Sequence, residues 1–150
     1  MSNARSREVA VAAAKLLADS YTLYLKTHNF HWNVTGPMFN TLHTMFETQY
    51  TELALAVDEI AERIRAIGQH APGSYAEFGE ITSVRDGKPG TKALDMVREL
   101  VDDQLKVAAS AKELIAVAEK NGDDVSVDLG VRRMQVHEKT AWMLRSHLEE

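Results

Sequence analysis

Two helical patterns meet at a single break within residues 28–68, and this stretch constrains the fold most. The break is Thr35-Gly36-Pro37. Glycine is typical just past a helix end and proline within a first helical turn, so this tripeptide predicts two helices joined by a tight turn. Apolar residues of the second helix recur at spacings of three, four or seven, which predicts one buried face. That stripe consists of Leu42, Phe46, Leu53, Val57, Ile60, Ile64 and Ile67.

Histidine and carboxylate side chains share a second face of the same helix. At about 100° per residue, His43, Glu47, Asp58 and Glu62 fall in a sector roughly 100° wide beside the apolar stripe. These nitrogen and oxygen donors are the kind that bind iron, zinc or manganese. Each i,i+4 pair can converge on one ion. His31 lies in the last turn of the first helix, close to the break. Its imidazole is a fifth candidate ligand.

The spacing between the two pairs predicts a site shared by two subunits. At about 1.5 Å of rise per residue, Glu47 and Asp58 lie roughly 16 Å apart along the helix axis. Metal–ligand bonds are near 2 Å, so the pairs cannot share an ion within one chain. If two copies of the helix pack antiparallel about a two-fold axis, each His43–Glu47 pair meets the partner's Asp58–Glu62 pair. The sequence therefore predicts two equivalent metal sites per dimer.

The remaining sequence predicts two further long helices and one long connection. The four long helices are expected at residues 4–33, 37–67, 91–121 and 124–148. Glycine and proline are dense in residues 69–90, within which a short helix over 74–81 begins at an N-capping Ser74. The fold class is therefore all-α, a single 1–150 domain forming a four-helix bundle with a long crossover that carries the short helix. The predicted core stripes of the last two helices are Leu94, Val97, Val101, Leu105, Ala108, Ala111, Ile115 and Ala118, and Val127, Val131, Met134, Ala141 and Leu144.

Composition restricts the compartment and the partners. A chain of 150 residues with 45% hydrophobic residues can bury one sizeable core. It has no cysteine, no apolar run of membrane-spanning length and no signal-peptide pattern, so we expect a cytoplasmic protein without membrane contact. The net charge of −5 attracts cations and disfavours a surface that coats nucleic acid.

Around the predicted metal ligands, the chain resembles the Dps family, the miniferritins of starved bacteria. The resemblance rests on HNFHWNVTGPMF, on His43-x-x-x-Glu47 and on Asp58-Glu59-Ile60-Ala61-Glu62-Arg63. It implies a ferritin-like bundle that assembles into a hollow dodecamer, oxidises Fe²⁺ with hydrogen peroxide and stores the ferric mineral. It also implies ferroxidase sites at the two-fold interface, with the short crossover helix nearby. The implied ligands are His31, His43 and Glu47 of one subunit and Asp58 and Glu62 of its partner.

Other residues receive secondary roles. By resemblance, Trp32 lies beside the metal site and helps to exclude water. His28 is expected to be a half-buried, hydrogen-bonded histidine behind the ligands. Asp123 and Asp128 match positions that line a negative three-fold pore in Dps shells, where carboxylates would draw Fe²⁺ inward. Capping of the last helix explains Asp123 or Asp124 equally well.

Three alternatives remain at this point. The first is a DNA-compacting starvation protein with little ferroxidase role. Affinity for DNA depends on lysine and arginine, and the N-terminal tail offers only Arg5 and Arg7, so we expect weak or absent DNA binding. The second is a di-iron oxidase or larger ferritin, which would use Glu-x-x-His pairs that this sequence lacks. The third is a metal-free interaction bundle, which leaves the mixed donor face unexplained.

Overall fold

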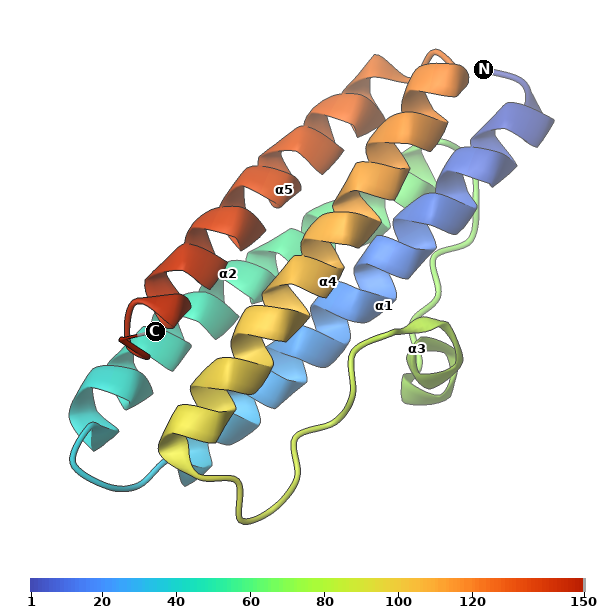
Figure 1. Ribbon diagram of the computed structural model, residues 1–150. Coiled ribbons are helices and arrows are strands. Elements are labelled where there is room, and N and C mark those ends of the chain that lie inside the picture. The colour runs from blue at the N-terminus through green and yellow to red at the C-terminus, as the bar shows by residue number, and fades with distance from the viewer. Residues whose placement is uncertain (150) are drawn as a thin grey trace.

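Residues 1–149, which the structure describes, form five α-helices and no β-strand in a computed structural model (Figure 1). The helices are α1 (Asn3–Asn33), α2 (Phe39–Ala66), α3 (Tyr75–Ile81), α4 (Ala93–Lys120) and α5 (Asp124–Arg145). The predicted all-α class, the order of long helices and the short crossover helix are confirmed. The last long helix ends at Arg145 rather than at the predicted 148. Within the described range, no helix is long and apolar enough to cross a membrane.

The four long helices pack as two antiparallel hairpins, α1 with α2 and α4 with α5. Helices α1 and α4 join the hairpins to each other, whereas α2 and α5 touch only sparsely. After α2 the chain runs back along the outside of the bundle, forms α3 beside α1 and enters α4 at the end where α2 began (Figure 1). This return makes α4 run parallel to α2, as a ferritin-like bundle with one crossover requires.

Side chains of all four long helices fill the core, although two predicted stripes contain errors. The α2 stripe is confirmed at its five fully buried members, which are Leu42, Phe46, Leu53, Ile60 and Ile64. Leu94, Leu105 and Val131 were predicted in the core and are exposed. In α4, Val97, Val101, Ala108, Ala111 and Ala118 are buried as predicted, and the buried row also contains Leu100, Gln104, Val107 and Leu114. The polar Gln104 occupies the buried position of this turn. Leu105, the next residue, therefore points outward.

A buried polar network explains why polar residues occupy core positions. Gln104 accepts from Nδ1 of His137 at 2.6 Å, and Arg133 donates to Nε2 of the same ring at 3.1 Å. Arg133 also forms a bidentate ion pair with the carboxylate of Glu52, with N–O distances of 2.5 and 3.0 Å. Burial, followed by the charge of Arg133, lowers the pKa of His137 to about 3. His137 is thus a neutral structural residue that joins α5 to α4.

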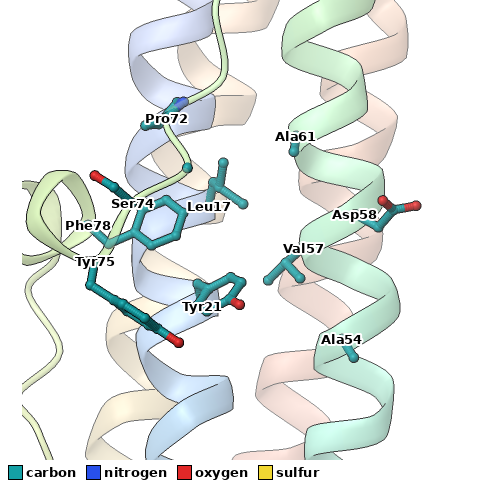
Figure 2. A pocket seen from close by; sticks show the side chains of 11 residues that line it. Leu17, Tyr21, Ala54, Val57, Asp58, Ala61, Pro72, Ser74, Tyr75 and Phe78 are labelled. Carbon is teal, nitrogen blue, oxygen red and sulfur yellow. The ribbon is translucent and has the colours of Figure 1, made fainter.

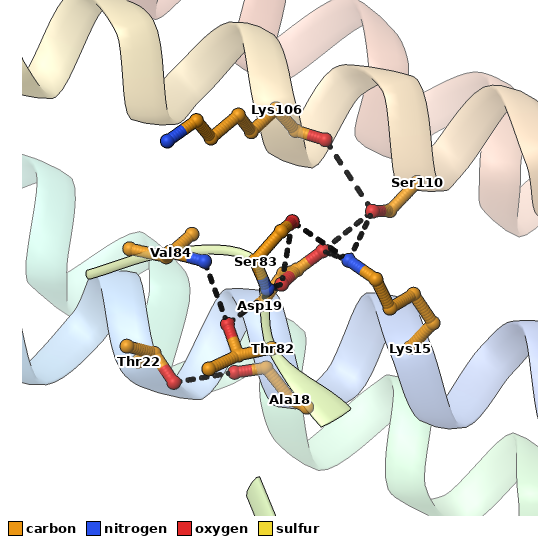
Figure 3. A network of polar contacts seen from close by, with 9 residues as sticks. All are labelled: Lys15, Ala18, Asp19, Thr22, Thr82, Ser83, Val84, Lys106 and Ser110. Atoms are coloured by element: carbon orange, nitrogen blue, oxygen red, sulfur yellow. Dashed lines mark hydrogen bonds and ion pairs between the residues drawn. The ribbon is translucent and has the colours of Figure 1, made fainter. Parts of the chain in front are cut away.

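A second buried network fixes the crossover against the bundle. Asp19 of α1 is fully buried and accepts hydrogen bonds from Thr82 Oγ1, Ser83 N and Ser110 Oγ, at 2.7, 2.8 and 2.5 Å (Figure 3). Its other partner is the ammonium group of Lys15. Burial alone would raise the pKa of Asp19, but the hydrogen bonds from Lys15, Ser110, Thr82 and Ser83 hold it below its ordinary value. One carboxylate therefore ties α1, α4 and the end of α3 together.

Capping groups define where the helices begin and end. Ser74 accepts from the backbone N–H of Glu77, which confirms it as the N-cap of α3. Gly68 and Gly122 follow α2 and α4 with φ of +87° and +70°, a conformation that favours glycine over residues with a Cβ. Gly122 lies in the short turn between α4 and α5, whereas Gly68 lies where the chain leaves α2 for the long crossover to α3.

Candidate metal centre

His31 of α1 and His43 of α2 hold each other in a reciprocal arrangement. Their rings are stacked, with centroids 3.8 Å apart and planes 13° from parallel. His31 Nδ1 lies 2.6 Å from the carbonyl oxygen of His43, and His43 Nδ1 lies 2.7 Å from the carbonyl oxygen of His31. A carbonyl oxygen only accepts, so each Nδ1 carries the proton and donates it. Because Nδ1 carries the proton in this arrangement, Nε2 is the nitrogen of each ring that can bind a metal ion.

Glu47 lies one helical turn beyond His43 and extends the pair to three donors. Its Oε1 is 3.9 Å from Nε2 of His31. Glu47 is more than half exposed, whereas His31 is buried. The three groups thus meet at the corner between α1 and α2, where the carboxylate of Glu47 faces solvent and His31 is buried.

Asp58 and Glu62 form a separate acidic pair farther along α2. Both side chains are exposed, and Figure 2 shows Asp58 directed away from the side of α2 that faces α1. A hydrogen bond with Asp58, followed by the charge of Asp58 and by burial, raises the pKa of Glu62. The charge of Asp58 therefore disfavours the ionised form of Glu62, and a cation bound between the two carboxylates would relieve that repulsion.

The two groups of donors stay apart within one chain. In residues 1–149, no set of three or more histidine, cysteine, aspartate or glutamate side chains is placed to hold a metal ion. His31, His43 and Glu47 form one cluster, and Asp58 and Glu62 form another. The five-ligand set, divided between two subunits, therefore remains a prediction.

Aromatic rings surround the histidine pair. His28 is half-buried between Trp32 and Tyr50, with ring centroids 4.0 and 4.1 Å away. Burial, and then the charge of His31, lower the pKa of His28. Phe39 stacks on His43 at 4.9 Å. Trp32 is 59% exposed in the single chain, so the role of excluding water remains a prediction that depends on what covers it.

Tyr50 is a neighbour of the site that sequence reasoning missed. Its ring meets that of His31 edge-on, with centroids 5.1 Å apart. The signal was available, because Tyr50 follows His43 by seven residues and Glu47 by three, and these spacings share one face of a helix.

The two aspartates predicted to line a pore have different surroundings. Asp123 is nearly fully buried and caps α5: its Oδ1 accepts from Ser126 N at 3.1 Å and from Arg63 at 2.7 Å. Burial acts to raise the pKa of Asp123, but the hydrogen bonds from Ser126 and the charge of Arg63 hold it below its ordinary value. Asp128 is exposed and pairs with Arg132. The capping role of Asp123 is confirmed, and the pore remains a prediction.

Comparison with known proteins places the chain among the ferritin-like proteins. The family model described as a ferritin-like domain matches residues 12–150. The crystal structure of a Dps protein from Vibrio cholerae O1, described as a member of a broad superfamily of ferritin-like diiron-carboxylate proteins, has a TM-score of 0.94 at 28% identity. The match covers 99% of this chain and 93% of that one.

Two more similar proteins narrow the class to one family. DNA protection during starvation protein 2 of Bacillus anthracis is 39% identical over 145 residues, which are 97% of this chain and 99% of that protein. The crystal structure of a Dps protein from Bacillus brevis has a TM-score of 0.94 at 35% identity and covers 99% of both chains. The chain therefore belongs to the Dps family of ferritin-like proteins.

Proposed function

We propose that the protein oxidises Fe²⁺ with hydrogen peroxide and stores the ferric product inside a dodecameric shell. The reaction takes place where His31, His43 and Glu47 of one subunit meet Asp58 and Glu62 of its two-fold partner. The observation that carries this proposal is the reciprocal bonding of the two histidines, because it commits Nδ1 of each stacked ring to a carbonyl oxygen and leaves Nε2 as the nitrogen available to a metal ion. Membership in a ferritin-like family supports iron handling in general.

The donor set suits iron as a substrate. Imidazole is a borderline donor and carboxylate a hard one, so the mixture accepts Fe²⁺ and also stabilises the Fe³⁺ that forms. Asp58 raises the pKa of Glu62, and a cation bound between the two carboxylates would relieve their repulsion. Two bound ferrous ions give one electron each to one peroxide molecule, which takes up two protons and leaves as two molecules of water. Glu47, exposed and close to Nε2 of His31, lies where an incoming ion would meet it first.

DNA compaction is the second candidate function, because the relatives bear the name DNA protection during starvation. The chain carries 22 acidic and 17 basic residues, and this excess of acids opposes binding to phosphates. We expect weak or no DNA binding, and protection would then come from removing iron and peroxide. A gel-shift complex that persists through a salt series would contradict this expectation.

The test is anaerobic oxidation of Fe²⁺ by stoichiometric peroxide in the wild type and in Asp58→Asn. Asp102→Asn, the same change at an exposed aspartate of α4, is the matched control. Size-exclusion chromatography shows whether all three proteins assemble alike. We expect fast oxidation in the wild type and control and slow oxidation in an assembled Asp58→Asn. Equal rates in all three proteins would refute the assignment of Asp58.

A further inference from the structure

Two dipeptides of the chain place glycine directly after aspartate or asparagine. They are Asp86-Gly87 in the crossover and Asn121-Gly122 at the end of α4. In such a dipeptide the backbone nitrogen of glycine can attack the side-chain carbonyl carbon of the preceding residue and close a five-membered succinimide ring. Glycine favours this step because it has no side chain to hinder the nitrogen and its backbone rotates freely. The local structure decides whether the ring forms in the folded protein.

The structure holds Asn121-Gly122 in a conformation that prevents ring closure. Asn121 is buried, and its Nδ2 donates to the carbonyl oxygen of Val117 at 2.8 Å. The N–H of Gly122 donates to the carbonyl oxygen of Glu119 at 3.1 Å. The backbone ψ of Asn121 is 5°, so the nitrogen of Gly122 eclipses the backbone nitrogen of Asn121 instead of the Cβ that the ring requires. The more reactive of the two side chains, a carboxamide, is therefore protected while α4 is intact.

No comparable bonds hold Asp86-Gly87. This dipeptide lies between α3 and α4, in a segment without helix. Within residues 1–149, neither the carboxylate of Asp86 nor the N–H of Gly87 makes a hydrogen bond or an ion pair. The side chain and the nitrogen that must meet are thus both without a partner. Ring closure here breaks no hydrogen bond of the fold.

Packing against α1 explains why a glycine occupies position 87. A Cβ at Gly87 would lie 2.7 Å from Cε1 of Phe30, whose ring is fully buried, and 3.0 Å from Nδ2 of Asn29. Asn29 Nδ2 also donates to the carbonyl oxygen of Gly87 at 3.5 Å. The crossover can approach the end of α1 this closely only without a side chain at position 87. The same requirement leaves the amide after Asp86 unhindered.

We propose that Asp86 is a site of spontaneous isomerisation to isoaspartate in the folded, assembled protein, and that Asn121 is spared. This modification goes beyond the proposed function and does not depend on iron or peroxide. It marks the crossover of protein that has persisted for a long time.

The steps balance in atoms and need no oxidant or cofactor. The nitrogen of Gly87 forms a bond to Cγ of Asp86, and one molecule of water leaves. Water then adds to one of the two ring carbonyl carbons. Cleavage of the bond between the nitrogen and Cγ restores aspartate. Cleavage of the bond between the nitrogen and the main-chain carbonyl carbon leaves a free α-carboxylate and a chain that continues through Cβ and Cγ, which is isoaspartate.

The product changes the crossover where it packs on α1. Isoaspartate adds one carbon to the main chain immediately before Gly87, so the glycine can no longer keep its position on the ring of Phe30. The bond from Asn29 should weaken as well. We therefore expect amide hydrogen exchange in residues 82–92 to become faster as isoaspartate accumulates.

The experiment ages the assembled protein and maps isoaspartate in it. Assembled protein, isolated by size-exclusion chromatography, is kept for several weeks at neutral pH and physiological temperature. Electron-transfer fragmentation of its peptides distinguishes isoaspartate from aspartate, and an isoaspartyl methyltransferase with labelled S-adenosylmethionine measures the total. Asp86→Glu is the test variant, because glutamate would have to close a slower six-membered ring. Asp102→Glu, at an exposed aspartate of α4, is the matched control, and a wild-type sample in urea reports on the unfolded chain.

We expect isoaspartate at position 86 in the wild type and in Asp102→Glu, and loss of most methyl label in Asp86→Glu. Asn121 should stay intact in the assembled protein and be deamidated in urea. Aged, assembled wild type without isoaspartate at position 86, as would result if a neighbouring subunit immobilised the segment, would overturn the proposal. Equal methyl label in the wild type and Asp86→Glu would overturn it too. Deamidation of Asn121 at the same rate in the assembled protein and in urea would refute its protection by the end of α4.

Discussion

His31 and His43 lie twelve positions apart and each donates its Nδ1 proton to the backbone carbonyl of the other. The carbonyl of His31 is in the last turn of α1, where backbone oxygens lack a partner within the helix. The hydrogen bond from His43 satisfies that oxygen. The same two bonds therefore join α1 to α2 and orient both Nε2 atoms, so the corner of the bundle and the candidate metal centre depend on one arrangement.

Loss of one histidine should weaken iron binding strongly. His43→Ala removes one Nε2 donor and also the N–H that His31's carbonyl accepts, so we expect Fe²⁺ affinity to fall by more than about tenfold. Anaerobic isothermal titration calorimetry measures the affinity. His70→Ala, at an exposed histidine beyond α2, is the control and should bind as the wild type does. Equal affinity of His43→Ala and wild type would remove His43 from the site.

Asp19→Asn should destabilise the fold and alter its response to acid. The folded pKa of Asp19 is lowered, so this carboxylate contributes stability above its unfolded pKa, and the contribution is lost as pH falls through the lower folded pKa. Breaking a buried ion pair on one side should cost about 3 kcal/mol at pH 7. Urea unfolding at pH 7 and pH 3, at fixed protein concentration, measures this, and the two proteins should differ less at pH 3. An unchanged urea midpoint at pH 7 would contradict the role of Asp19.

His137 should make the protein less stable in mild acid. Its folded pKa of about 3 lies below the value near 6.5 of an unfolded histidine, so the unfolded state binds a proton that the folded state does not. Below about pH 6.5 the free energy of unfolding should fall by up to about 1.4 kcal/mol per pH unit from this group. The difference between wild type and His137→Gln, measured by urea unfolding from pH 4 to 7, isolates the effect. His70→Gln should retain the wild-type slope, and a His137 ring that titrates near pH 6.5 by NMR would refute the prediction.

Two glycines should respond oppositely to alanine. A Cβ at Gly130 of α5 would lie 2.6 Å from Ile115 Cγ1 and 3.1 Å from the carbonyl oxygen of Ala111, where α4 and α5 approach closely. Gly130→Ala should therefore lower stability by about 1–3 kcal/mol despite the better helix propensity of alanine. At Gly79 of α3 a Cβ meets nothing within 4 Å, so Gly79→Ala should be neutral or stabilising by up to about 1 kcal/mol. Thermal unfolding ranks the variants, and a stabilised Gly130→Ala would contradict the close approach.

The fold could be predicted from sequence because apolar periodicity and glycine or proline breaks are local signals. Errors arose where tertiary contacts decide burial. Leu105 was placed in the core because it is apolar, yet Gln104 occupies the buried row, since a hydrogen bond to His137 on another helix stabilises it there. The only local signal at Asp19 is its i,i+4 spacing to Lys15, because its other partners, Thr82, Ser83 and Ser110, are 63 to 91 residues away.

The donors of the candidate centre could be identified from helical spacing, whereas their hydrogen bonding could not. The tautomers of His31 and His43 depend on two backbone carbonyls across the turn, which periodicity does not reveal. The pairing of Asp123 with Arg63 likewise joins α2 to the start of α5 and could be inferred only once both helices were placed.

The central claim, a site built from two subunits, is tested most directly by mixing two inactive variants. His43→Ala damages one half of the site and Asp58→Asn the other, so a two-fold dimer of one with the other contains one intact site and one doubly damaged site. Random mixing, verified by native mass spectrometry, should restore about a quarter of the wild-type rate of peroxide-driven iron oxidation, because half of the interfaces are mixed and each has one intact site of two. Mixing His43→Ala with His31→Ala damages the same half twice and should restore nothing. Mixed His43→Ala and Asp58→Asn assemblies that remain inactive would contradict a shared site.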